Sequence, residues 1–217
     1  MAGSGLTLVI GDKNFSSWSL RPWLLLKMFD IPFREERIRL RQPDTRARIL
    51  AQSPSGWVPI LKDGDLTIWD TLAIAMHLVE RFPTLALWPA SPEPRAVAQS
   101  ITAEMHSGFG ALRTVCSMNI LGRMQGFMPV TDVKGDIARI DALWQDARAR
   151  FGKGGDFLFG TFTIADAFYA PVVTRFRTYG VKVSKVSQAY CNAILTTDGM
   201  REWERGAREE MSASGGD

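Results

Sequence analysis

The sequence is poor in the residues that build disulfide scaffolds and metal centres, with only two cysteines and two histidines among 217 residues. Cys116 and Cys191 lie far apart and match no metal-ligand or redox spacing, so we expect two reduced, buried thiols that are not nucleophiles. No apolar run approaches the roughly 18 residues of a membrane-spanning helix, and residues 1–4 lack the basic start of a secretory signal. These absences predict a cytoplasmic protein with no metal and no membrane contact.

Strong charge of one sign is also absent. Lysine and arginine number 26 against 23 for aspartate and glutamate, and a net charge of +3 is too small to indicate a nucleic-acid partner. Six arginines nevertheless gather within fifteen residues of the chain: Arg34, Arg37, Arg39, Arg41, Arg46 and Arg48. They form either a solvated basic surface or a rim that steers an anionic small molecule.

The chain from residue 6 to residue 82 alternates short apolar runs with segments of helical periodicity. We expect strands at residues 6–10, 33–40, 57–61 and 66–69, and helices at residues 19–28, 45–51 and 71–82. A helical crossover makes the first two strands parallel, whereas the short glycine turn at Gly64 makes the last two an antiparallel hairpin. The predicted order is therefore βαβαββα.

After Phe82 the composition changes, and no later segment has the pattern of a strand. The proline-rich residues 83–94 are expected to form a stiff linker. Helices are expected at residues 95–124, 132–150, 163–179, 188–195 and 199–210, before a disordered tail from Ser212. Thr163 and Asp166 have the spacing of a capping box. We predict two domains, an α+β domain at residues 1–82 and an all-α domain at residues 95–217.

Three serines stand where the first helix should begin, between Asn14 and Pro22. Unpaired backbone N–H groups and the positive end of the helix dipole converge at such a start and stabilise a thiolate, carboxylate or phosphate. Because proline lacks an N–H, Pro22 predicts either that regular helix begins near Ser19, which would cap it, or that the first turn is distorted. In both cases Ser16 and Ser17 are expected on the preceding loop, where they can face a ligand. Alternatively, all three are only caps and turn residues.

The combination of these features resembles a cytosolic glutathione S-transferase. The βαβαββα order, Val58-Pro59 before the third strand, an acidic-hydroxyl pair opening the third helix and an all-helical second part occur in the order of that family. The Ser-Ser-Trp-Ser-Leu-Arg run from Ser16 to Arg21 is similar to the Ser-Ser-Cys-Ser-x-Arg motif of the zeta class, with Trp18 replacing the cysteine. The resemblance implies a thioredoxin-like first domain, glutathione as co-substrate and a homodimer.

The resemblance also implies glutathione-binding residues. The peptide bond before Pro59 would be cis, so that the Val58 backbone pairs with the cysteinyl part of glutathione like an added strand. The hydroxyl and helix-start N–H of Thr71 would bind the γ-glutamyl carboxylate, and Asp70 would face the amine. Alternatively, Pro59 is only a proline at a strand edge, and Asp70 and Thr71 are only a helix cap.

For catalysis, the thiol of glutathione must ionise near neutral pH, since the thiolate is the nucleophile. Ser16 is the first candidate to donate a hydrogen bond to the sulfur, and Ser17 is its rival. The electrophile would lie between the domains against Trp18, Met105 and Phe109, although the last two fit a core equally well.

Two functions remain open at this stage. The chain is either a glutathione transferase or isomerase acting on a small electrophile, or a non-catalytic module of the same fold that binds proteins. His106 is either a proton shuttle or a structural histidine. A disulfide reductase is disfavoured, because the active loop has no cysteine for a mixed disulfide.

Overall fold

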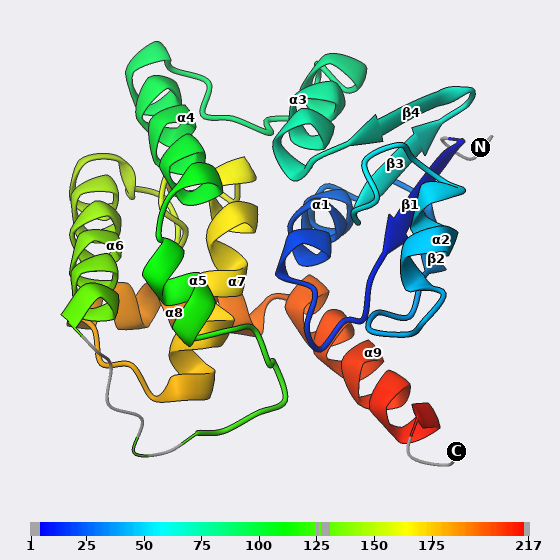
Figure 1. Ribbon diagram of the computed structural model, residues 1–217. Coiled ribbons are helices and arrows are strands. Elements are labelled where there is room, and N and C mark those ends of the chain that lie inside the picture. The colour runs from blue at the N-terminus through cyan, green and yellow to red at the C-terminus, as the bar shows by residue number, and fades with distance from the viewer. Residues whose placement is uncertain (1–4, 125, 127–130, 215–217) are drawn as a thin grey trace.

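The structure, a computed structural model, describes residues 5–124, 126 and 131–214 (Figure 1). A four-stranded sheet forms one part of the molecule, with the strand order β2-β1-β3-β4. The strands are β1 (Leu6–Ile10), β2 (Arg34–Arg37), β3 (Ile60–Asp63) and β4 (Leu66–Trp69). β1 and β2 are parallel and β3 and β4 are antiparallel, as the sequence predicted. β3 is also antiparallel to β1.

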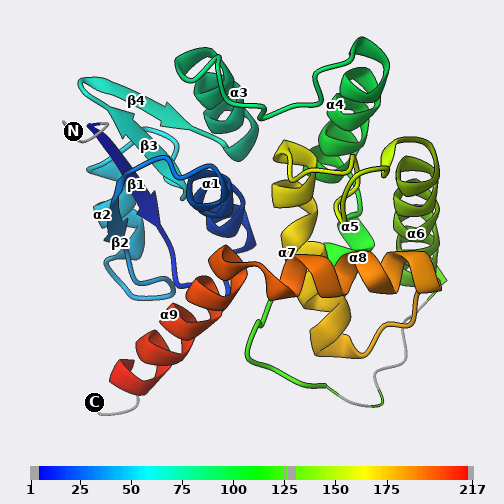
Figure 2. The same ribbon diagram turned by 180° about the vertical axis from the view of Figure 1, so that it is seen from behind.

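Helices cover both faces of this sheet (Figures 1 and 2). The short helix α2 (Thr45–Leu50) lies on the outer face, where Ile49 packs against Val9 and Ile60. α1 (Ser17–Met28) and α3 (Thr71–Arg81) lie on the inner face, toward the rest of the molecule. Alternate residues of a strand point to opposite faces, so β1 contributes Leu8 and Ile10 to the inner face and Val9 to the outer one. The predicted thioredoxin-like βαβαββα arrangement is confirmed.

The second part is helical. Its elements are α4 (Pro92–Ser107), α5 (Gly110–Val115), α6 (Thr131–Phe151), α7 (Ile164–Tyr179), α8 (Lys185–Thr196) and α9 (Asp198–Ser214). α7 is buried along almost its whole length and packs against α1, α4 and α8, so it forms the centre of the molecule (Figure 2). The predicted capping box of Thr163 and Asp166 opens this helix.

Three predictions about the helical part were wrong in detail. The long helix expected at residues 95–124 is two helices, because Gly108 and Phe109 leave helical geometry and Phe109 takes a left-handed φ of 59°. Residues 116–124 are not helical. The tail expected to be disordered from Ser212 is helical as far as Ser214, and residues 215–217 lie outside the described part of the chain.

α9 returns from the helical part to the sheet part (Figure 1). The indole Nε1 of Trp203 donates to the carbonyl of Lys13 at 2.8 Å, and the backbone N–H of Lys13 donates to Glu210 Oε2 at 2.8 Å. The ring of Trp203 also packs edge-on against Trp23 of α1, with 5.1 Å between centroids. The last helix therefore holds the loop between β1 and α1.

Both cysteines are free and buried, as expected. Burial raises the pKa of the Cys116 thiol and raises that of Cys191 to about 12, so neither is a thiolate at neutral pH. None of the helices that the structure describes is long and apolar enough to cross a membrane.

Candidate active site

The start of α1 arranges its three serines differently from the prediction. Ser16, not Ser19, is the N-cap, and its Oγ accepts a long hydrogen bond of 3.4 Å from the Ser19 N–H. The Ser16 hydroxyl donates to Ser19 Oγ at 2.7 Å, and Ser19 Oγ also accepts from the Gly11 N–H at 3.0 Å. Ser16 and Ser19 thus satisfy each other inside the protein.

The helix begins at Ser17 and continues through Pro22, where the sequence predicted a later start or a distorted first turn. Within a regular helix the carbonyl of Trp18 would accept from the N–H of residue 22, which proline lacks. Thr71 of α3 supplies a donor instead, because its Oγ1 donates to the Trp18 carbonyl at 3.4 Å. A tertiary contact therefore offsets part of the cost of the proline.

Ser17 is the hydroxyl left with capacity to bind a ligand. Its Oγ accepts from the Nη2 of Arg175 at 3.1 Å, and no acceptor for its own hydrogen lies among the described residues. The backbone N–H of Trp18, one residue on, likewise has no acceptor in the described part of the chain. The first turn of α1 consequently offers an O–H and an N–H to an anion.

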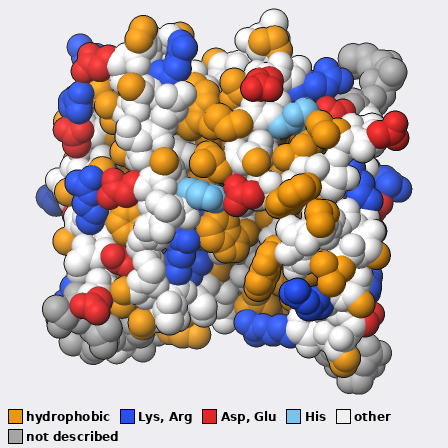
Figure 3. All heavy atoms as spheres, turned by 45° about the horizontal axis from the view of Figure 1, so that its top comes forward, with side chains coloured by type: hydrophobic (Ala, Val, Ile, Leu, Met, Phe, Trp, Pro, Cys, Tyr) orange, Lys and Arg blue, Asp and Glu red, His pale blue; other side chains and the backbone are white. Residues whose placement is uncertain are grey.

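Two adjoining hollows contain the predicted glutathione-binding residues. The larger, of about 470 Å³, has Ser16 and Ser17 in its wall, and the smaller, of about 370 Å³, has Pro59, Asp70 and Thr71. Three residues line both hollows: Trp18, Trp57 and Val58. On the face of the molecule in Figure 3, hydrophobic side chains gather between the two parts and both histidines reach the surface.

The bond between Val58 and Pro59 is cis, as the family resemblance implied. Neither the N–H nor the carbonyl of Val58 has a backbone partner in the described chain, since β3 begins only at Ile60. Trp57, just before, is 73% exposed at the mouth of both hollows. The backbone just before β3 is thus open at Val58 to pairing with an extended peptide.

Asp70 opens α3 with a left-handed φ of 73°. Its Oδ1 accepts from the N–H groups of Leu72 at 2.8 Å and Ala73 at 3.3 Å, so the plain-cap interpretation holds for one carboxylate oxygen. The other oxygen lies 3.5 Å from His106 Nε2 across the interface with α4. The backbone N–H of Thr71 has no partner among the described residues.

The predicted electrophile residues are only partly brought together. Trp18 lines both hollows, but Met105 and Phe109 are buried in the core and line neither. His106 lies edge-on to Trp18 at 5.4 Å between ring centroids. Burial lowers the pKa of His106, with Arg21 and Arg113 acting in the same direction and Asp70 opposing them, so the imidazole is neutral at neutral pH.

Sequence reasoning missed a cluster of three arginines, of which Arg21 and Arg113 lie against the Trp18 ring and Arg175 binds Ser17. Arg21 is 3% exposed, and its guanidinium carbon lies 4.3 Å from the Trp18 ring centroid, while that of Arg113 lies at 5.0 Å. Burial lowers the pKa of Arg21 to about 9 and that of Arg175 to about 10, with Arg113 adding to both effects. The three arginines come from α1, α5 and α7, which are far apart in the sequence. The only signal of the cluster in the sequence was that each arginine lies within an otherwise apolar helix.

Of the six arginines between residues 34 and 48, the larger hollow includes Arg41 and Arg46 in its wall. The guanidinium carbon of Arg41 lies 4.9 Å from the ring centroid of Phe15. Two of the six arginines therefore lie at this hollow, and their role as a rim that steers an anion stays a prediction. No group of three or more residues able to hold a metal ion occurs in the described part of the chain.

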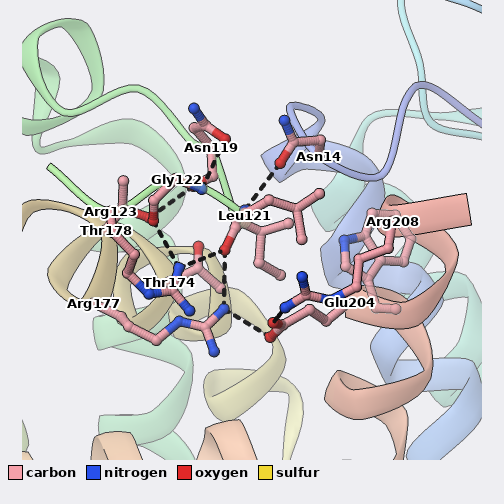
Figure 4. A network of polar contacts seen from close by, with 12 residues as sticks. Asn14, Asn119, Leu121, Gly122, Arg123, Thr174, Arg177, Thr178, Glu204 and Arg208 are labelled. Carbon is pink, nitrogen blue, oxygen red and sulfur yellow. Dashed lines mark hydrogen bonds and ion pairs between the residues drawn. The ribbon is translucent and has the colours of Figure 1, made fainter. Parts of the chain in front are cut away.

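Residues 116–124 support the serine loop from behind (Figure 4). The N–H of Ile120 donates to the Asn14 carbonyl and the N–H of Leu121 to Asn14 Oδ1, both at 3.1 Å. Arg177 of α7 fixes the same segment, because its Nη2 donates to the Ile120 carbonyl at 3.0 Å and to Glu204 at 2.8 Å. Asn14, two residues before Ser16 in the serine loop, is thereby linked to the helical part of the molecule.

Comparison with known families agrees with this geometry. Residues 15–81 match the model of the glutathione S-transferase N-terminal domain, and residues 130–205 match that of the glutathione S-transferase C-terminal domain. The chain belongs to the glutathione S-transferase family. A zeta-class glutathione S-transferase from Euphorbia esula is 26% identical over 173 residues, which are 76% of this chain and 74% of that protein.

Solved structures of the family have the same fold. A maleyl pyruvate isomerase, described as a bacterial glutathione S-transferase of the zeta class, has a TM-score of 0.71 at 22% identity, covering 91% of this chain and 95% of its own. A glutathione transferase homologue from Burkholderia strain BGR1, with bound glutathione, has a TM-score of 0.69 at 21% identity, covering 94% and 98%. At these identities the likeness establishes the fold.

Proposed function

We propose that the protein is a glutathione-dependent enzyme that ionises the glutathione thiol for attack on, or isomerisation of, a small electrophile. The observation that carries the proposal is the joint opening of three binding elements on adjoining hollows: the free donors of Ser17 and Trp18, the unpaired backbone of Val58, and the start of α3 at Asp70 and Thr71. Glutathione has a thiol, a peptide backbone and an amino-acid head that match these elements in order. The family relation and the glutathione-bound relative support the same ligand.

In this proposal the thiolate lies at the start of α1. Ser17 is the better donor, because the Ser16 hydroxyl already donates to Ser19. A shift of two units in the thiol pKa requires about 2.7 kcal/mol, which one charge-assisted hydrogen bond and the helix dipole can supply. Ser16 then contributes by capping the helix and shaping the wall of the larger hollow.

The rest of glutathione follows from the charges around the hollows. The γ-glutamyl carboxylate would accept from the Thr71 N–H, and the amine would face the free side of Asp70. The glycyl carboxylate would lie near Arg41 or Arg46 in the larger hollow. Trp18 would form a wall of the electrophile site. The roles assigned to Met105 and Phe109 remain predictions.

A titration tests the proposal. Glutathione is added to the protein, and the ultraviolet absorbance of the thiolate is followed with pH. We expect saturable binding and a bound-thiol pKa well below the ordinary cysteine value of about 8.5. A second assay, with one conjugation substrate and one small unsaturated acid, separates transfer from isomerisation. The zeta-class relatives favour isomerisation. Absence of binding would leave the non-catalytic alternative.

The family relation also supports a homodimer. Two exposed apolar side chains, Trp57 and Trp69, line the smaller hollow, and Leu66 is exposed at the other end of β4. Pairing of two chains would cover such a surface. We expect a mass near twice 24.1 kDa in light scattering, and a single-chain mass at micromolar concentration would contradict the dimer.

A further inference from the structure

Arg175 connects the centre of the helical part with the start of α1. Its Nη2 donates to Ser17 Oγ at 3.1 Å, across 158 positions of sequence. Its Nη1 donates to the carbonyls of Cys116 and Arg113, at the end of α5. The side chain is only 6% exposed and comes from the most buried helix of the molecule. The guanidinium is therefore held on one side while it binds the serine on the other.

The chemistry of this contact determines where the Ser17 hydrogen can go. A guanidinium has donors and no acceptor, so the Ser17 oxygen must accept and its own hydrogen must point elsewhere. A hydrogen bond from a charged donor also polarises the hydroxyl, which strengthens the next hydrogen bond in the chain. The Ser16 hydroxyl has no such charged partner among the described residues, where it hydrogen-bonds only to Ser19.

The charged surroundings favour this polarisation. The titratable groups that act on the pKa of Arg175 include Arg113, Cys116 and Tyr179, and Arg21 interacts with Arg175 as well; none of these four is a carboxylate. Burial and Arg113 lower the pKa of Arg175 to about 10, which still leaves it cationic at neutral pH. Its hydrogen-bond partners on the Nη1 side are neutral carbonyls. Among the residues that the structure describes, no carboxylate hydrogen-bonds to the Arg175 guanidinium, so the positive charge next to Ser17 has no paired acid there.

We propose that Arg175 is a positioning residue for the thiol chemistry: it holds the Ser17 oxygen so that the polarised hydroxyl donates to the sulfur of glutathione in the larger hollow. This inference rests on the proposed function. It assigns part of the thiolate stabilisation to α7 of the helical part, outside the serine motif and the glutathione-binding residues. The contact also couples the packing of the two parts of the molecule to the reactivity of the thiol.

The test measures the pKa of bound glutathione from thiolate absorbance in the wild type and in Arg175→Met, at saturating glutathione. We expect the methionine variant to raise that pKa by about one unit, which lowers the thiolate fraction about tenfold at pH values below it. In a Ser17→Ala background the same substitution should add almost no shift, because the hydroxyl through which Arg175 acts is gone. If Arg175→Met does not fold, Arg175→Lys replaces it, with a smaller shift in the same direction.

Arg177→Met is the matched control. Arg177 lies on the same helix and donates to the Ile120 carbonyl and to Glu204. It therefore supports the serine loop only through residues 116–124, and in the described chain it has no hydrogen bond to Ser17. We expect its loss to destabilise the chain and leave the bound-thiol pKa unchanged. An equal shift in Arg177→Met, no shift in Arg175→Met, or a full shift in the Ser17→Ala background would each overturn the inference. Failure of the wild type to bind glutathione would instead overturn the proposed function.

Discussion

The starts of α7 and α1 use similar residues and reach opposite outcomes. At α7 the Asp166 carboxylate accepts from the N–H of Leu158 at 3.1 Å, and from the N–H and Oγ1 of Thr163 at 2.8 and 3.0 Å. At α1, Ser16 and Ser19 bind each other, but the donors of Ser17 and Trp18 have no acceptor in the described chain. A cap residue by itself therefore does not mark a ligand site, whereas donors left over at a hollow do.

Burial explains the difference. Asp166 is completely buried, and a buried donor without a partner costs about 1–3 kcal/mol, so its surroundings are closed by internal hydrogen bonds. Ser17 lies in the wall of a hollow, where a ligand or solvent can satisfy it. The start of α7 therefore contributes to stability, and the start of α1 is suited to binding. Substitutions at the two should therefore affect different measurements.

The largest expected effect is at α7. Asp166→Ala leaves three buried donors without an acceptor and should lower the free energy of unfolding by about 4 kcal/mol. Urea denaturation measures the loss. Molecules that still fold should bind glutathione with an unchanged thiol pKa. A shifted thiol pKa in Asp166→Ala would break the division between the two helix starts.

Asp166→Asn provides a pH test of the same site. Burial raises the pKa of Asp166 from 3.8 to about 6, against the hydrogen bonds that lower it. Because the folded pKa is the higher one, the protonated group stabilises the fold fully below the unfolded pKa, and this contribution is lost as pH rises through about 6. Asparagine does not titrate. The stability of the wild type relative to Asp166→Asn should therefore fall between about pH 4 and pH 6, and a rise would contradict the raised pKa.

The next effect is at α1 and concerns reactivity. Ser17→Ala should raise the pKa of bound glutathione by about 1–2 units and lower turnover at neutral pH by about 10- to 100-fold. Its free energy of unfolding should fall by about 1 kcal/mol, because the largely buried Arg175 loses an acceptor, while the cap at Ser16 stays in place. The pH dependence of the rate checks the first expectation. An unshifted profile would leave the thiolate to the backbone amides.

Ser16→Ala sharpens the comparison within α1 itself. As the cap, Ser16 should contribute about 1 kcal/mol to stability, while activity per folded molecule stays nearly intact. Thermal unfolding and specific activity of the folded fraction measure the two. A shifted thiol pKa in Ser16→Ala with an unshifted one in Ser17→Ala would return the role to Ser16, the first candidate from sequence.

Much of this fold followed from local pattern, and the failures have tertiary causes. Alternation of strand and helix periods predicted the βαβαββα order, and spacing alone predicted the box at Thr163. The cap of α1 was misassigned, because the partner that compensates Pro22 comes from Thr71, far along the chain. The arginine cluster was missed since only folding brings α1, α5 and α7 together. The cis bond at Val58 came from family resemblance, as physical chemistry favours trans there.

The smallest expected effect is at the start of α3. This start combines an internal hydrogen bond that stabilises the fold with a position in the wall of a hollow, where it can bind a ligand. Thr71→Val removes the long hydrogen bond to the Trp18 carbonyl and should cost about 0.5 kcal/mol of stability. Pro22→Ala restores a backbone N–H that can bind the same carbonyl, so the cost of Thr71→Val should shrink in that background.

The same double-mutant cycle separates structure from binding at Thr71. If the Thr71 hydroxyl turns from the Trp18 carbonyl to the γ-glutamyl carboxylate when glutathione binds, Thr71→Val weakens glutathione binding. Pro22→Ala cannot restore that loss, because it acts only on the carbonyl of Trp18. Stability is then rescued while affinity is not. Calorimetric titration with glutathione measures the affinity and urea denaturation the stability. Rescue of both would make Thr71 a purely structural partner of Pro22 and leave the head of glutathione to the backbone N–H and Asp70.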